Sequence, residues 1–549
     1  MLKIVGSILL LSLVGLLTVR CSDLYTAMSD LEGIFKTEAR MIKAVEEYLR
    51  QERDRLEKIE TKLANLRRLN QEGQEDVDAY LSHPFNAFLL TKRFLWEWVD
   101  LENWIKISMP SREYIFNTTG LRSKGPQQSD LDGAAEALWR LQDTYKFTPA
   151  ELVEGAKTED ALKAHHCFEV GRLAYHVAND KYHAIPWMEE AHRLLNNETM
   201  EGDFFTMNET EILDHLAFAS FSEERLDDAI AFTNKLIALV PDSVRYTDNK
   251  AYYQYLLDKK YRPRGETGDL KKLSLDDVEE EEEEEEEEIA EEDMDEDDLR
   301  KVHPDIRQYR ALCRGDEGVV KSIPKPALRT CSYQHYDQPQ LILQPAKEEI
   351  AFVKPRIVVY HDILSNEEIA ALKDIAKPRL ERATIWNSTS GHLEQTKFRI
   401  SKCGWVQHDE AEVIRRLYRR VGAYTGLSMN ATEFLQIANY GLGGHYLPHF
   451  DFTRDVATHK NGNRIASMLF YLSDVAKGGD TVFIDAGAKI KPEKGSAIFW
   501  YNLFKNGKVD ERTKHASCPV ISGSKWVANM WMHEHGQEFR RPCSTGKSE

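Results

Sequence analysis

The sequence predicts a multidomain α + β protein with an N-terminal coiled-coil and helical domain, a tetratricopeptide-like helical domain and a C-terminal double-stranded β-helix, or jelly roll. Three observations support this fold class: a heptad pattern, amphipathic helical repeats and, towards the C-terminus, short β-rich runs. The 549 residues are 42% hydrophobic, which is enough for several domains with real cores. The expected division is a signal peptide at 1–21, the coiled-coil domain at 22–144, the repeat domain at 145–260, an acidic linker region at 261–345 and the β-rich domain at 346–549.

The N-terminus has the pattern of a secretory signal peptide. Lys3 precedes an apolar stretch from Ile4 to Val19, and small and polar residues follow around Cys21. The apolar run is too short for a membrane anchor, and no later segment has the pattern of a transmembrane helix. We therefore expect a soluble lumenal or secreted protein. Five glycosylation sequons agree with that route: Asn117, Asn197, Asn208, Asn387 and Asn430.

The net charge of −19 is concentrated in one segment. Residues 276–298 contain ten consecutive Glu and further acids but no Lys or Arg, and their charge equals that of the whole chain. The remainder is formally neutral, which does not favour a nucleic-acid-binding surface. Because like charges repel, we expect this segment to be an extended, solvated linker. The alternative is a tail that binds basic partners or Ca²⁺.

A seven-residue pattern predicts a long helix ahead of the repeats. Apolar residues occupy one heptad position six times, at Met28, Phe35, Ile42, Leu49, Leu56 and Leu63. This indicates a coiled coil of roughly 60 Å, for which self-association is the natural use. The alternative is a single helix that folds back on its own domain through the Trp-rich stretch "FLWEWVDLENWI".

The middle of the chain fits a helical repeat. Counted from Thr210, the 34-residue tetratricopeptide template places Ala217, Ala229 and Pro241 at its small, small and proline positions, and Gly171 marks a weaker copy. Paired helices of this kind form a concave groove suited to an extended peptide. Three aromatic residues that could line the groove, or alternatively pack within it, are Tyr175, Tyr252 and Tyr255.

From about residue 346 the sequence consists of short β-rich runs separated by Gly, Asp and Asn. These runs are "RIVVYHDIL", "EFLQIANYG", "ASMLFYLSD", "DTVFID", "SAIFWYN" and "KWVANMWMH". Many short strands punctuated in this way favour a sandwich or jelly roll.

His-x-Asp occurs three times, beginning at His303, His335 and His449. Only His449 lies in a strand context, where a period of two directs His449 and Asp451 to the same face. His515, in "RTKHASCPV", is the candidate third ligand from a distant strand. Two His and one carboxylate leave three open coordination positions, as in non-haem Fe(II) oxygenases. A zinc hydrolase is the chemical alternative.

Lys525 favours the oxygenase. It lies in the apolar strand "GSKWVANMW", where an unpaired ammonium group would be costly. A dicarboxylate co-substrate that chelates the metal at one end would supply the missing anion at the other.

Several motifs carry a resemblance to a known family. "HYLPHFDF", "RTKHASCPV" and "GSKWVANMWMHEHGQEFRRPC", with the repeat region and the coiled coil, resemble the catalytic α subunit of collagen prolyl 4-hydroxylases. The resemblance implies that His449, Asp451 and His515 bind Fe(II) and that Lys525 pairs with the distal carboxylate of 2-oxoglutarate. Two further roles are implied: Tyr440 helps to hold that carboxylate, and His533, unless it is a surface residue, assists co-substrate binding and decarboxylation.

The resemblance also implies an activity and partners. The enzyme would hydroxylate proline at C4 in collagen-like Xaa-Pro-Gly sequences, using Fe(II), 2-oxoglutarate, O₂ and ascorbate and releasing succinate and CO₂. Protein disulfide isomerase would be the β subunit, and a second α chain would complete an α2β2 tetramer in the endoplasmic reticulum lumen. The alternatives are a related oxygenase acting on another residue or protein, and a non-enzymatic lumenal lectin or scaffold.

Two details concern cysteines and the groove. An oxidising compartment permits disulfides without revealing their pairing, but the resemblance suggests Cys313 with Cys331 and Cys518 with Cys543, leaving Cys167 and Cys403 free. Where relatives have tyrosines in "LDYLSYAVY"-like runs, this chain has "LDHLAFASF". We expect substrate preference to depend on the three changed groove positions, His215, Phe218 and Phe221.

Overall fold

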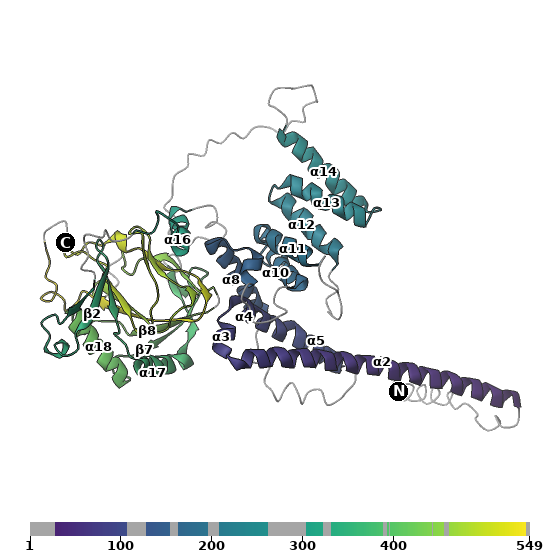
Figure 1. Cartoon of the computed structure of the whole chain (residues 1–549), viewed down its shortest axis with the longest axis horizontal. Coiled ribbons are helices and arrows are strands. Elements are labelled where there is room, and N and C mark those ends of the chain that lie inside the picture. Colours follow the sequence, from purple (N-terminus) through teal and green to yellow (C-terminus); the bar gives the residue numbers. More distant parts are fainter. Residues whose placement is uncertain are drawn as a thin grey trace, which may run out of the picture. The chain divides into compact units, whose positions relative to one another are not determined.

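The computed structural model describes most of the chain, and two compact units can be distinguished (Figure 1). The first contains residues 1–71 and 96–124, and the second contains 72–95 and 125–549. The expected signal peptide and the acidic run lie outside the described residues. Those are 28–106, 128–153, 163–195, 208–261, 303–321, 331–387, 392–394, 396–441, 443–454 and 460–544.

The heptad region is one continuous helix, α2 (Met28–Glu75). Its later turns contact the Trp-rich stretch of the same unit: Lys62 pairs with Glu97 at 3.0 Å, and Arg55 Nη1 donates to the carbonyl of Trp104, in α5 (Trp98–Lys106), at 2.9 Å. The folded-back packing is therefore present in this half of the helix. Leu56 and Leu63 nevertheless remain 49% and 39% exposed, so the described residues leave these two heptad positions uncovered. No helix among the described residues has the length and apolarity needed to cross a membrane.

Five helices of the second unit form the repeat region. They pack in sequence order, and small residues lie where the helices approach closely. A Cβ added to Gly171 would lie 3.0 Å from Met188 Cγ, while Ala217 and Ala229 are buried. The small positions of the repeat template therefore mark helix contacts. The helices are α10 (Ala164–His176), α11 (Lys181–Leu195), α12 (Glu209–Ser222), α13 (Leu226–Leu239) and α14 (Val244–Tyr261).

The β-rich domain is a jelly roll of two antiparallel sheets. Its large sheet has nine strands in the order β1 (Cys331–Gln334), β2 (Ala346–Phe352), β3 (Ile357–His361), β14 (Ala497–Tyr501), β10 (Arg464–Tyr471), β17 (Lys525–His533), β8 (Leu435–Tyr440), β7 (Lys402–Val406) and β4 (Glu381–Arg382). Its small sheet has the order β13 (Ala488–Ile490), β12 (Thr481–Phe483), β15 (His515–Ser517) and β9 (Tyr446–His449). The predicted β-rich runs are strands of these two sheets.

Apolar residues from both sheets fill the interior, including Tyr471, Phe483 and Trp500. The outer face of the large sheet is covered by α17 (Asn366–Ala376) and α18 (Glu412–Thr425), which Figure 1 shows beside its strands. Both faces of the large sheet are therefore buried, which explains the near-continuous apolar character of its central strands.

The jelly-roll domain begins before the expected boundary at residue 346. α16 (Pro304–Arg314) packs on the outer face of the small sheet, and β1 pairs with β2. Tyr309 donates to the Ser517 carbonyl at 3.1 Å, and Lys514 pairs with Asp305 at 2.6 Å. Because α16 lies between the acidic run and the first strand, it fell within the expected linker region at 261–345. It carries a buried apolar face instead.

A second helix supports the rim of the jelly roll. In α8 (Gln128–Tyr145), Arg140 donates to the Gly443 carbonyl at 3.2 Å and Tyr145 donates to the Pro519 carbonyl at 2.7 Å. Gly443 has φ of 55°, and a Cβ at this position would lie 2.9 Å from Ala137, so glycine is required here. The glycine cluster before β9 thus permits close approach of α8.

The disulfide pairing expected from the resemblance is wrong in this structure. Cys313 of α16 bonds to Cys518, which follows β15, with Cα atoms 5.6 Å apart. Packing of α16 on the small sheet brings these two cysteines within bridging distance, which spacing along the sequence could not indicate. The other described cysteines, which lie outside this disulfide, are Cys167, Cys331, Cys403 and Cys543.

Candidate functional site

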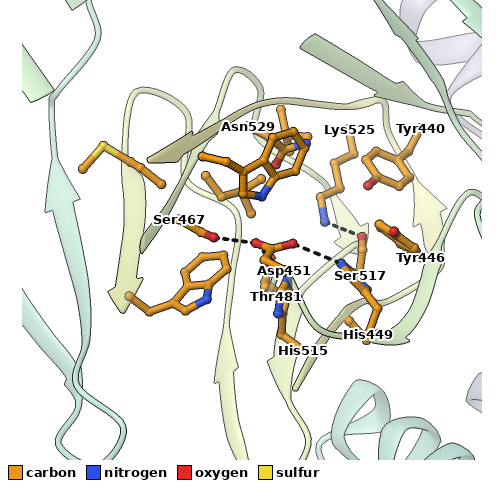
Figure 2. Close-up of a pocket in the computed structure, with 16 residues that line it drawn as sticks. Tyr440, Tyr446, His449, Asp451, Ser467, Thr481, His515, Ser517, Lys525 and Asn529 are labelled. Carbon is orange, nitrogen blue, oxygen red and sulfur yellow. Dashed lines mark hydrogen bonds and ion pairs between the residues drawn. The ribbon is translucent and has the colours of Figure 1, made fainter. Parts of the chain in front are cut away.

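Two imidazoles and a carboxylate meet at the edge of the small sheet (Figure 2). β9 and β15 are antiparallel neighbours, and their register places His449 directly opposite His515. Asp451 follows two residues after His449, and the candidate ligand atoms of all three lie within 4.8 Å of one another. The Nε2 atoms of His449 and His515 lie 3.8 Å and 3.7 Å from the oxygens of Asp451.

Hydrogen bonds orient each of these side chains. Nδ1 of His449 lies 2.8 Å from the Leu447 carbonyl and Nδ1 of His515 lies 2.9 Å from the Thr513 carbonyl. Because a carbonyl can only accept, both rings carry their proton on Nδ1 and direct the Nε2 lone pair towards the shared centre.

A hydrogen-bonded chain fixes the carboxylate in turn. Ser467 Oγ donates to Asp451 Oδ2 at 2.6 Å, Asn502 donates to Ser467 at 2.9 Å, and Trp500 Nε1 donates to Asn502 at 2.8 Å. All four of these side chains are buried. Such outer partners are typical of carboxylates that bind metal ions.

Electrostatics suit a divalent cation at this centre. Burial, together with the neighbouring His515, lowers the pKa of His449 to about 3, so the imidazole is neutral and its lone pair is available. Burial alone would raise the pKa of Asp451, but the two imidazoles and Arg464 lower it overall. Two neutral nitrogen ligands and one anionic oxygen ligand fit a divalent transition metal that keeps open positions.

Lys525 lines the same pocket, where it lies near Ser517 and Tyr440 (Figure 2). Its side chain is 1% exposed, and Nζ donates to Ser517 Oγ at 2.6 Å and lies 5.2 Å from the centre of the Tyr440 ring. Burial lowers the pKa of Lys525 to about 7, against the opposing effect of Asp480. Asp480 itself pairs with Lys489 at 3.3 Å, and no carboxylate of the described residues forms an ion pair with Lys525. The pocket therefore presents a buried amine that an anionic ligand would complement.

Tyr440 is the cross-strand neighbour of Lys525, and burial raises the pKa of its hydroxyl. Several pocket residues were not predicted from the sequence, among them Tyr446, which stacks on His449 at 3.5 Å between ring centres, and Asn529. A period of two from Lys525 along β17 would have found Asn529, but no local signal identified Tyr446. The remaining polar residues of the lining are Ser467, Thr481 and Ser517.

His533 is not among the residues that line this pocket. It ends β17, where Nε2 lies 2.9 Å from Glu433 and Nδ1 lies 2.7 Å from the Gly462 carbonyl. Glu433 also accepts from Arg464, which donates to the Asp451 carbonyl at 3.3 Å. His533 is thus connected to the loop that carries Asp451 through Glu433 and Arg464 rather than by direct contact.

Four of the predicted groove residues form a partly exposed aromatic row on the repeat helices. Tyr175 lies 6.2 Å from Phe218, Phe218 lies 6.0 Å from Phe221, and Phe221 lies 5.9 Å from Tyr252, between ring centres. Phe218 and Tyr252 are 45% and 53% exposed, so these rings do not belong to the helical core. His215 contacts Tyr175 at the beginning of the row, and Tyr255 is exposed on α14.

Comparison with known proteins gives the same picture for all three regions. Family models match 27–159 as the prolyl 4-hydroxylase alpha-subunit N-terminal region, 164–259 as the prolyl 4-hydroxylase peptide-substrate-binding domain and 435–533 as the 2OG-Fe(II) oxygenase superfamily. Human prolyl 4-hydroxylase subunit alpha-1 is 40% identical over 96% of this chain and 96% of the relative. Prolyl 4-hydroxylase subunit alpha-2 of Caenorhabditis elegans is 37% identical over 95% of this chain and 93% of the relative. A viral collagen prolyl hydroxylase from Paramecium Bursaria Chlorella virus-1, solved with 2OG, is 27% identical over 32% of this chain and 94% of its own, with a TM-score of 0.27.

Proposed function

The chain belongs to the prolyl 4-hydroxylase α-subunit family, and we propose that it hydroxylates C4 of proline in collagen-like Xaa-Pro-Gly sequences. It is a 2-oxoglutarate-dependent prolyl 4-hydroxylase that uses Fe(II). The observation that carries the assignment of the site is a single pocket with the His449, Asp451 and His515 cluster at one end and the buried amine of Lys525 at the other.

In this proposal His449, Asp451 and His515 hold Fe(II) through two Nε2 atoms and a carboxylate oxygen. With 2-oxoglutarate and O₂, bound Fe(II) supplies the oxidation that inserts one oxygen atom into the proline C4–H bond while the co-substrate becomes succinate and CO₂. Ascorbate is the proposed reductant that returns oxidised iron to Fe(II).

The chain's own residues orient the reactants. Lys525, protonated when the anion binds, pairs with the distal carboxylate of 2-oxoglutarate, with Tyr440 beside it. The carbonyls of Leu447 and Thr513 keep both imidazoles in the binding tautomer. His533 is proposed to assist co-substrate binding and decarboxylation, and its Glu433 and Arg464 contacts connect it to the loop that carries Asp451.

Substrate peptide is proposed to bind along the aromatic row. Tyr175, Phe218, Phe221 and Tyr252 offer successive ring faces, which suit the rigid rings of a proline-rich chain. His215 and Tyr255 extend this surface at its two ends. The groove would hold a long substrate while the pocket acts on one proline at a time.

For partners, we propose an α2β2 tetramer with protein disulfide isomerase as β subunit, formed in the endoplasmic reticulum lumen. The exposed heptad leucines of α2, Leu56 and Leu63, support association with a second α chain. Light scattering should give a smaller assembly for the Leu56→Glu, Leu63→Glu double variant than for the Thr61→Glu control, which adds a charge at an exposed polar position. Equal masses would contradict association through this helix.

Lumenal glycosylation is part of the same proposal. Asn208 and Asn430 are exposed, Asn387 lies in β5 (Ile385–Asn387), and Asn117 and Asn197 lie outside the described residues. When the protein is expressed through the secretory pathway, treatment with an N-glycosidase should therefore increase its mobility in gel electrophoresis. An unchanged mobility would count against the lumenal route.

The activity is tested by CO₂ release from labelled 2-oxoglutarate. Pro-Pro-Gly repeats should stimulate release and yield 4-hydroxyproline, whereas matched repeats containing lysine in place of proline should not. Stimulation by the lysine peptide alone would favour a related oxygenase with another substrate. Failure of both peptides to stimulate release would contradict the collagen-like substrate.

A further inference from the structure

Two imidazoles from different helices form a hydrogen-bonded pair at one end of the aromatic row. Nε2 of His176, at the end of α10, lies 2.9 Å from Nε2 of His215, in α12. Nδ1 of His215 lies 2.7 Å from the Glu211 carbonyl, so this nitrogen carries a proton and donates it. In the neutral pair the lone pair of His215 Nε2 must therefore accept, and His176 Nε2 must donate.

The tautomers leave one nitrogen available. Nδ1 of His176 makes no hydrogen bond with any residue that the structure describes, and the side chain is exposed at the surface of the repeat. The ring of Tyr175 contacts both imidazoles edge to face, at 4.7 Å between ring centres in each case. The pair is therefore part of the same surface as the first ring of the proposed groove.

Lys181, at the start of α11, adds a cation beside this pair. Its Nζ lies 3.7 Å from the centre of the Tyr175 ring and donates to the Tyr175 carbonyl at 2.7 Å and to Asn179 Oδ1 at 3.0 Å. All of these partners are neutral, and no carboxylate of the described residues forms an ion pair with Lys181. Its positive charge is therefore not neutralised by a direct partner within this region.

Most acidic side chains around the His176–His215 pair form ion pairs or hydrogen bonds with other groups. Glu169 pairs with Arg172 on α10, Asp214 of α12 pairs with Arg245 of α14, and Asp180 bonds to His183. Asp180 and Glu223, which follows α12, act on Lys181 through space without forming an ion pair with it. Burial lowers the pKa of His176, and the nearby basic groups His215, Arg172 and Lys181 lower it further.

We propose that His176, His215 and Lys181 form an anion subsite in the groove, which selects proline-rich peptides that carry a Glu or Asp next to the proline held by the aromatic row. The proposal rests on the groove binding peptide, and it adds the kind of residue that the peptide must contain. A carboxylate in this position would accept from the Lys181 ammonium and from a protonated imidazole.

The sign of the pH dependence follows from the pair. Taking up a proton converts the neutral pair into a cation, and a bound carboxylate stabilises that form. Preference for an acidic peptide should therefore increase as the pH falls from 8 to 6. Because the subsite is largely exposed, the preference for Glu over Gln should be modest, roughly three- to tenfold at pH 6 and smaller at pH 8.

The test is fluorescence anisotropy on the whole assembled protein with two labelled peptides. Both are Pro-Pro-Gly repeats in which one position next to proline is replaced by Glu or by Gln, so that they differ only in charge. The wild type should prefer the Glu peptide at pH 6, and His215→Tyr and Lys181→Gln should each reduce the ratio of the two affinities towards one. Lys235→Gln is the matched control, because Lys235 is an exposed lysine over Phe232 on α13.

The outcomes separate the subsite from the groove. Equal affinities of the wild type for the two peptides at both pH values would overturn the anion subsite while leaving the groove intact. If neither peptide binds, the proposal that the groove binds peptide is rejected, and the anion subsite is rejected with it. A preference that survives in the His215→Tyr, Lys181→Gln double variant would assign it to other residues and also reject the proposal.

Discussion

The metal pocket and the aromatic groove differ in how firmly their side chains are held. In the pocket, the cluster side chains are fixed by backbone carbonyls or by the buried Ser467 and Asn502 chain. In the aromatic row, Phe218 and Tyr252 are exposed, and each contacts the ring of Phe221 edge to face. A pocket held in this way cannot exchange residues without losing its geometry, whereas the groove can. Substrate preference can therefore change while the chemistry stays the same.

The largest expected effect comes from removing a member of the metal cluster. His449→Ala, Asp451→Ala and His515→Ala should each reduce CO₂ release to background and lower the iron content, because the remaining two groups bind a divalent ion weakly. His335→Ala is the matched control, since His335 begins an exposed His-x-Asp pair. Metal analysis, activity and circular dichroism should be measured together. Full activity in any of the three variants would reject the assignment.

The sequence could predict this cluster only in part. Alternation along β9 indicated that His449 and Asp451 share a face, and strand character singled them out from His303 and His335. His515 was proposed as the third ligand from its own sequence context, but its position opposite His449 could not be predicted, because the register between β9 and β15 is set by tertiary pairing. The Ser467 contact with Asp451 was missed for the same reason.

Long-range packing also explains what the sequence could not predict about the rest of the fold. The pairing of Cys313 with Cys518 joins positions separated by 205 residues, and it depends on α16 lying on the small sheet. Helices, strands and the repeat were predictable because their signals are local periods of 3.6 and 2 residues. Contacts between elements distant in sequence have no such local signal.

The next effect concerns the other end of the pocket. Lys525→Met keeps most of the side-chain volume but removes the charge, so the distal carboxylate of 2-oxoglutarate would be buried without a partner. The KM for 2-oxoglutarate should rise by about a hundredfold, corresponding to about 3 kcal/mol. At saturating co-substrate kcat should fall much less, because the metal cluster is intact. An unchanged KM would assign Lys525 a purely structural role.

A smaller, graded effect follows from the pKa of Lys525, which burial lowers to about 7. Below pH 7 the amine is already protonated and co-substrate binding needs no proton. Above pH 7 binding must take up a proton, so the KM for 2-oxoglutarate should rise with pH, approaching about tenfold per unit. Lys525→Arg remains charged and should flatten this profile between pH 6 and 9. Parallel profiles for wild type and Lys525→Arg would show that another group controls the dependence.

The smallest expected effect lies in the groove. Phe218→Tyr and Phe221→Tyr each add a hydroxyl group to the row, and a hydrogen bond to a peptide carbonyl contributes about 0.5 to 1.5 kcal/mol. Calorimetry with a proline-rich peptide should therefore show binding tightened by roughly two- to tenfold, with the gain limited at the more exposed Phe218. Phe232→Tyr on α13 serves as the control outside the row. Because Phe221 also stacks on Tyr253 at 4.8 Å, its new hydroxyl should be the better oriented of the two. If neither Phe218→Tyr nor Phe221→Tyr changes peptide affinity, substrate does not lie along this row. Changes in the row would then not explain differences in substrate preference.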